Sequence, residues 1–117
     1  MDGKKYDLED RLIKFAVDMV KVSRQADWTD YASRYYQQQI IRSSGSVALN
    51  FGEFLGASSQ KDKLNKLSIA HKEIKECRNN LLIQIGAELN DKTELEKLSQ
   101  ESLELIKILR AIIKSKS

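Results

Sequence analysis

Four polar residues near the middle of the chain follow one another at intervals of four, four and three: Arg42, Ser46, Asn50 and Glu53. On an α-helix, which turns by about 100° per residue, this spacing places them along one ridge. Arg42 is suited to a phosphate or a carboxylate, and Asn50 can form hydrogen bonds across a helix interface. The ridge is therefore either a contact for a partner or RNA, or a buried or inter-subunit polar network that fixes helix register. The second hypothesis is favoured, because Arg42 and Glu53 partly cancel as an anion site.

A second set of candidate residues is basic and belongs to the segment 61–78. The residues that we predict as phosphate contacts, if the chain binds nucleic acid, are Lys61, Lys63, Lys66, Lys72, Lys75 and Arg78. Acidic residues, Glu73 and Glu76, are interleaved with them. Such alternation of sign is more typical of a solvated helix face than of a stripe that follows phosphates.

The residues that catalysis or metal binding would require are few. His71 is the single histidine, and Ser68 stands three residues before it, where a di-metal bundle of the ferritin type has a glutamate. Cys77 is the single cysteine, so neither an intrachain disulfide nor a cysteine-based metal cluster can form. We therefore predict that the chain is not an enzyme and that it uses no metal and no cofactor.

Composition limits the kinds of partner and the cellular location that we expect for this protein. The chain has 117 residues, no proline, and 20 lysines and arginines against 17 acidic residues, a formal net charge of +3. This weak excess permits an acidic partner such as nucleic acid but does not require one. The N-terminal residues lack the apolar segment of a signal peptide, and no run approaches the roughly 18 apolar residues of a membrane span. We expect a cytoplasmic protein without membrane contact.

Four amphipathic segments must position these residues. Apolar residues recur at steps of three and four over about 7–25, 30–55, 60–85 and 94–114, which predicts four helices. Short links join them, and each apolar stripe is too wide to be stable alone. The economical solution is an all-α protein, a single domain over residues 1–117 built as an up-down-up-down four-helix bundle.

Cap residues are predicted from the types that precede each segment. The candidates are Asp7, Thr29, Ser59 and Thr93, whose side-chain oxygens can accept hydrogen bonds from the free amides of a first helical turn.

The second segment shows features that its own core does not explain. Its predicted apolar stripe consists of Ile40, Ser44, Val47, Phe51 and Leu55. Two glycines, Gly45 and Gly52, lie beside that stripe two turns apart, and each costs about 1 kcal/mol relative to alanine, so we expect a close helix crossing there. Leu49 lies among the polar ridge, and Ile69 in the third segment also points away from the core. We predict that Leu49 and Ile69 contact another subunit.

The polar ridge and its neighbours resemble a known family, the small four-helix bundle proteins related to the 23S ribosomal RNA intervening-sequence protein. The residues that match its second-helix pattern are Gln39, Ile40, Arg42, Ser43, Ser46, Val47, Asn50, Phe51 and Glu53. Those that match its third-helix pattern are Ser59, Asp62, Leu67, Ser68, Ile69, Ala70, Glu73 and Glu76. The chain departs from many relatives at Phe54, where they have glycine.

The resemblance implies a four-helix bundle assembled as a homopentameric ring. Some relatives are encoded within ribosomal RNA gene insertions; others are accessory factors of diversity-generating retroelements, which implies nucleic acid or a reverse transcriptase as partner. Our leading hypothesis is a non-enzymatic homo-oligomer that contacts RNA or an RNA–protein complex. The competing hypothesis is a protein–protein scaffold or adaptor without a nucleic-acid role.

Overall fold

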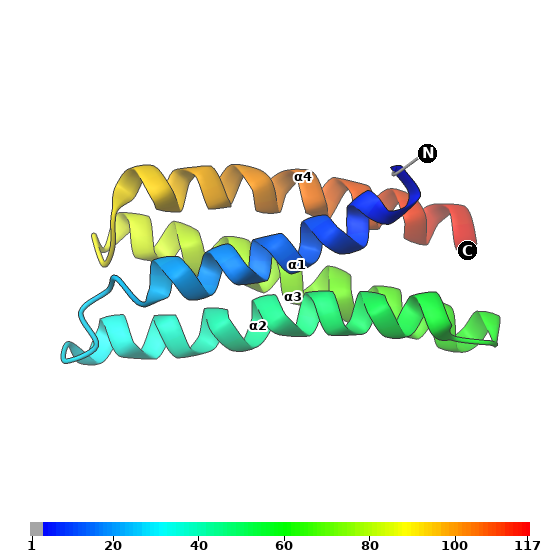
Figure 1. Cartoon of the computed structure of the whole chain (residues 1–117), viewed down its shortest axis with the longest axis horizontal. Helices are drawn as coiled ribbons and strands as arrows, with labels where there is room; N and C mark the ends of the chain where they lie inside the picture. The colour runs from blue at the N-terminus through cyan, green and yellow to red at the C-terminus, as the bar shows by residue number, and fades with distance from the viewer. Residues whose placement is uncertain (1–3) are drawn as a thin grey trace.

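The protein is an all-α four-helix bundle, as predicted. The computed structural model describes the backbone of residues 4–117 and the side chains of residues 8–117. The helices are α1 (Lys4–Ser23), α2 (Tyr31–Gly56), α3 (Gln60–Gly86) and α4 (Lys92–Lys116). They run alternately up and down in an elongated molecule of 45 × 29 × 19 Å, with the start of α1 and the end of α4 at the same end of the bundle (Figure 1).

Helix neighbours in the sequence are neighbours in space. The most extensive packing joins α2 to α3, followed by α3 to α4 and α1 to α2, whereas α1 and α4 form the weakest of the four helix contacts. As a result α3 lies between α2 and α4, and its polar residues are divided between two helix interfaces. This placement decides which charges on α3 meet a partner within the chain.

The cap of α3 forms as predicted, but that of α2 does not. Ser59 accepts a hydrogen bond from the amide of Asp62 at 3.0 Å. At α2 the cap is Asp30, whose carboxylate accepts from the amide of Ser33 at 2.8 Å. The prediction of Thr29 was wrong by one residue, because two good capping residues stand side by side there and the aspartate is the stronger of them.

The starts of α4 and α1 also differ from the predictions. Asp91 caps α4 and accepts from the amide of Glu94 at 3.0 Å, so Thr93 lies inside the first turn rather than at the cap. Helix α1 already begins at Lys4, so Asp7 is a residue of the helix and not its cap. Residues 1–3 lie outside the described part of the chain.

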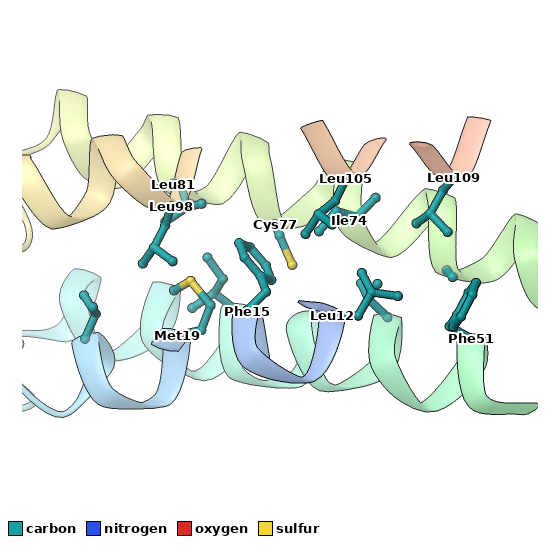
Figure 2. Close-up of a cluster of buried hydrophobic side chains, with 14 of the residues drawn as sticks. Leu12, Phe15, Met19, Phe51, Ile74, Cys77, Leu81, Leu98, Leu105 and Leu109 are labelled. Carbon is teal, nitrogen blue, oxygen red and sulfur yellow. The ribbon is translucent and has the colours of Figure 1, made fainter. Parts of the chain in front are cut away.

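The core is a continuous cluster of buried side chains from all four helices (Figure 2). Its largest fully buried members include Phe15, Met19, Ile74 and Leu105. One predicted stripe position was wrong: Leu55 is 54% exposed. The neighbouring residue Phe54 is buried instead, and its ring lies 5.3 Å from that of Phe51.

The single cysteine is part of this core. Cys77 is fully buried, its sulfur points from α3 into the interior (Figure 2), and it lies 3.3 Å from the hydroxyl of Ser43. Burial raises the pKa of the Cys77 thiol to about 12. The thiol is therefore protonated at neutral pH, as expected of a structural cysteine rather than a nucleophile.

The close helix crossing predicted at the two glycines of α2 is absent within the described chain. A Cβ atom at Gly45 would meet nothing within 4 Å. At Gly52 it would meet a carboxylate oxygen of Glu9 at 3.4 Å, which is ordinary contact. Neither glycine is therefore required by a close approach of another helix backbone within the described chain.

Candidate interaction surfaces

The polar ridge of α2 lies against charged residues of α3; we call this surface the α2/α3 seam. The Arg42 guanidinium nitrogen Nη2 lies 3.1 Å from Glu76 and 3.3 Å from Glu73, and Nη1 donates to the second oxygen of Glu73 at 3.5 Å. Hydrogen bonding to Glu73 raises the pKa of Arg42, and Glu76 adds to this effect. Arg42 is thus held between two carboxylates of the same chain.

The other end of the α2/α3 seam is also paired. Glu53 lies 2.7 Å from the Lys66 ammonium, and this hydrogen bond raises the pKa of Lys66. Asn50 donates to the carbonyl of Ser46 at 2.9 Å and to its hydroxyl at 3.1 Å, so it binds within α2 rather than across helices. The ridge therefore contributes to a structural network within the chain. Its two ends join α2 to α3.

Beneath the ion pairs of the α2/α3 seam lies a row of buried amide side chains that the sequence analysis missed. Gln37 donates to Gln84 at 2.9 Å, and Gln84 donates to Asn80 at 2.8 Å. Asn80 in turn donates to the carbonyl of Tyr36 at 3.0 Å. We call this the amide ladder. Its signal in the sequence was a glutamine seven residues before Ser44 and another seven after Cys77, both at stripe positions.

The six cations predicted as phosphate contacts do not form one surface. Lys66 and Lys75 are nine residues apart, which places them on opposite sides of α3. Lys66 faces α2 and is paired with Glu53. Lys61 and Lys72 are exposed, and Lys63 is half-buried. Only part of the set, including Lys75, remains available as a common basic surface.

A different basic cluster, the α3/α4 seam, consists of His71, Lys75, Arg78 and, from α4, Arg110. The first three follow at i, i+4 and i+7, and therefore along one side of α3. Burial lowers the pKa of His71, and the charges of Lys75 and Arg110 lower it further, so Arg110 lies within electrostatic reach. Sequence analysis missed Arg110, because nothing local in α4 links it to α3.

The α3/α4 seam has no counter-charge within the described chain. Among residues 8–117, no carboxylate lies within 4.0 Å of the charged groups of Lys75, Arg78 or Arg110. Two of its nitrogen atoms, His71 Nε2 and Arg78 Nε, are buried and have no hydrogen-bond partner in the described structure. Arg78 and His71 are otherwise half-buried, and Lys75 and Arg110 are exposed.

The two predicted oligomer contacts differ in exposure. Leu49 is 70% exposed and lies two turns beyond Arg42 on the same face of α2. Ile69 is half-buried, so the expectation that it points well away from the core holds only in part. Leu49 therefore offers the larger uncovered apolar area of the two.

The described residues contain no group of three or more side chains suited to hold a metal ion. Within the same residues, no helix combines the length and apolar character needed to cross a membrane.

Comparison with known proteins extends over almost the whole chain. The family model described as 23S rRNA-intervening sequence protein matches residues 4–111. A solved structure of a protein of unknown function from the S23 ribosomal protein family of Bacteroides thetaiotaomicron is 31% identical, with a TM-score of 0.83. The match covers 92% of this chain and 98% of that chain. A search of curated proteins found no match.

Proposed function

The chain belongs to the 23S rRNA-intervening sequence protein family, and from that premise we propose that it is a non-enzymatic homo-oligomer that binds RNA, free or within an RNA–protein complex. The bundle would act as a rigid support that presents charge, with no reacting group. Self-assembly would repeat the same basic surface around a ring, and a pentamer is the assembly that the family resemblance implies.

The observation that carries the proposal is the uncompensated charge of the α3/α4 seam. Elsewhere in residues 8–117, some cations, such as Arg11 and Lys14, lie within 4.0 Å of a carboxylate and others, such as Lys21, do not; the seam is set apart because its unpaired cations follow one another along one side of α3. The cations of the α3/α4 seam have no such partner among residues 8–117. Phosphates of RNA would supply the missing negative charge and release their counterions, which is the dominant source of affinity for nucleic acids.

Repetition in an oligomer compensates for the modest charge of one subunit. With a net charge of only +3, a single chain offers few phosphate contacts. Linked copies convert each further contact into an intramolecular event, and overall affinity can then exceed that of one site by orders of magnitude. The basic surface and the self-contact are therefore parts of one proposal.

A protein–protein scaffold without a nucleic-acid role is the second candidate. It is favoured by Leu49, which is 70% exposed, and by Gly45, beside which no atom of another helix lies within 4 Å. Both are what a foreign helix would need in order to approach α2. In this case the self-contact would persist and RNA would not bind.

A fluorescence anisotropy titration with a hairpin RNA at 50 and 200 mM salt tests the proposal. We expect affinity to fall steeply as salt rises. The variant Lys75→Gln/Arg78→Gln/Arg110→Gln should bind more weakly. If each lost cation had contacted one phosphate, the slope of log affinity against log salt should decrease by about 2 per subunit, at about 0.7 per contact.

The matched control is Lys14→Gln/Lys97→Gln/Lys107→Gln, which removes the same charge from lysines that are paired with carboxylates. This control should bind RNA nearly as tightly as the parent. Equal weakening of both variants would show that net charge alone drives binding and would remove the α3/α4 seam as the site. Absence of binding even at 50 mM salt would leave the scaffold as the function.

A further inference from the structure

Two buried nitrogen atoms without partners mark the α3/α4 seam as an incomplete site. Arg78 Nε always carries a hydrogen, since a guanidinium does not lose its proton in proteins, and no acceptor reaches it in the described structure. His71 Nε2 is likewise buried without a partner. Buried donors are nearly always satisfied in native proteins, so these two nitrogen atoms are positions at which an acceptor from outside the chain can bind.

The charged residues around these nitrogen atoms indicate that the acceptor is an anion. Burial holds the pKa of His71 below its ordinary value, and the positive charges of Lys75 from α3 and Arg110 from α4 lower it further. Arg78, on the same side of α3, adds a third permanent charge. No carboxylate among residues 8–117 offsets these charges at ion-pair distance. A cation would be repelled here, whereas an anion would be attracted.

We propose that His71, Lys75, Arg78 and Arg110 form an oxyanion-binding notch for a phosphate group. A phosphate carries acceptor oxygens on several sides and can therefore face donors from two helices at once, and guanidinium groups match its geometry. The ammonium of Lys75 contributes a mobile point charge at the rim. The proposal deepens the proposed RNA binding, and it depends on that function only where the phosphate belongs to RNA.

The histidine makes the notch observable. Because His71 is the only histidine of the chain, its imidazole protons give unambiguous nuclear magnetic resonance signals. A bound anion would favour the charged imidazolium that Lys75 and Arg110 now disfavour. The pKa of His71 should therefore begin below its ordinary value and rise when the notch is filled.

The experiment is a pH titration of the His71 signals in a buffer free of phosphate, at constant ionic strength set with sodium chloride. The added probes are inorganic phosphate, a tetrauridylate with a 5′-phosphate, and the same tetrauridylate without it. We expect a saturable rise of the His71 pKa. Arg78→Gln and Arg110→Gln should each weaken the response at least several-fold, whereas Lys97→Gln on the opposite side of α4 should leave it unchanged.

The probes distinguish the source of the phosphate. A response to the unphosphorylated tetrauridylate supports the notch and assigns it to backbone phosphodiesters of RNA. A response only to inorganic phosphate and to the 5′-phosphate supports the notch and assigns it to phosphate monoesters. Absence of any response in the parent protein overturns the notch. If the hairpin RNA nevertheless binds in the anisotropy titration, RNA binding stands and uses another surface.

Discussion

Helix α3 presents charge to two neighbours in opposite ways. Toward α2, Glu73 and Glu76 hold Arg42 between them, and Lys66 is paired with Glu53. Toward α4, the cations of the α3/α4 seam have no carboxylate at ion-pair distance among residues 8–117. Among the described residues, the charges of the first surface are paired and those of the second are not.

The difference separates residues that maintain the fold from residues that are free for a ligand. A paired cation such as Arg42 contributes to helix register, and its charge is largely cancelled for any outside molecule. A cluster of like charges destabilises the protein that carries it, so a ligand of opposite charge bound there would relieve the repulsion. The residue types and their spacing are similar on both sides of α3. Only the residues of the neighbouring helix determine which cations are paired.

The largest effect on stability is expected from the amide ladder beneath the α2/α3 seam. The substitution Gln84→Leu leaves the Gln37 amide without its acceptor and the Asn80 oxygen without its donor. Since both groups are buried, the free energy of unfolding should fall by about 1–3 kcal/mol. Urea denaturation at fixed protein concentration measures this. The exposed Gln38→Leu is the control and should stay within about 0.5 kcal/mol of the parent.

A neutral result for Gln84→Leu would mean that the ladder is dispensable. The α2/α3 seam would then be distinguished only by its surface ion pairs.

A smaller effect, with opposite signs at the two seams, is expected from removing one arginine. Arg42→Gln leaves Glu73, whose side chain is 11% exposed, beside Glu76 without a counter-charge. It should lower the free energy of unfolding by about 0.5–1 kcal/mol. Arg110→Gln removes a like charge and should leave stability unchanged or slightly raised. Denaturant unfolding at low and high salt tests both, because salt should reduce both effects.

If Arg110→Gln destabilised the protein as much as Arg42→Gln, the α3/α4 seam would also be compensated within the chain. The contrast between the two surfaces would then fail.

The substitution Leu49→Glu is expected to have the smallest effect on stability, but it should change the mass of the oligomer. This side chain is 70% exposed, so Leu49→Glu should change the free energy of unfolding by less than about 0.5 kcal/mol. It should nevertheless lower the assembled mass in light scattering, while helicity by circular dichroism persists. Ile69→Glu should lower the mass as well, with a greater loss of stability because Ile69 is half-buried.

Leu82→Glu is the matched control, since Leu82 is an exposed leucine of α3 outside both predicted contacts. Its mass should equal that of the parent. Parental mass in both Leu49→Glu and Ile69→Glu would exclude these positions from the interface.

The features that depend on periodicity within one helix were predictable from the sequence. The apolar stripes gave four helices and a bundle, and the spacing of Arg42 to Glu53 predicted one ridge. Competition between nearby capping residues displaced two predicted helix starts, from Thr29 to Asp30 and from Thr93 to Asp91. In each case the aspartate, which is a stronger capping residue than threonine, forms the cap.

The features that depend on a second helix were not predictable in the same way. Gln37 and Gln84 interrupt their apolar stripes, and only their mutual contact explains why they are buried. Likewise, the spacing of Lys66 and Lys75 places them on opposite sides of α3, but it does not tell which side meets α2. Arg110 stands at least 32 positions after the other members of the basic cluster, and periodicity within one helix does not relate residues of two different helices.

The position of Cys77 has a practical consequence. A water-soluble alkylating reagent can reach this thiol only when the helices separate. The rate of alkylation therefore measures how often the bundle opens. The native protein thus contains an intrinsic probe of its opening and needs no added dye. Comparing the alkylation rate with and without a bound polyanion would show how strongly the ligand stabilises the closed bundle.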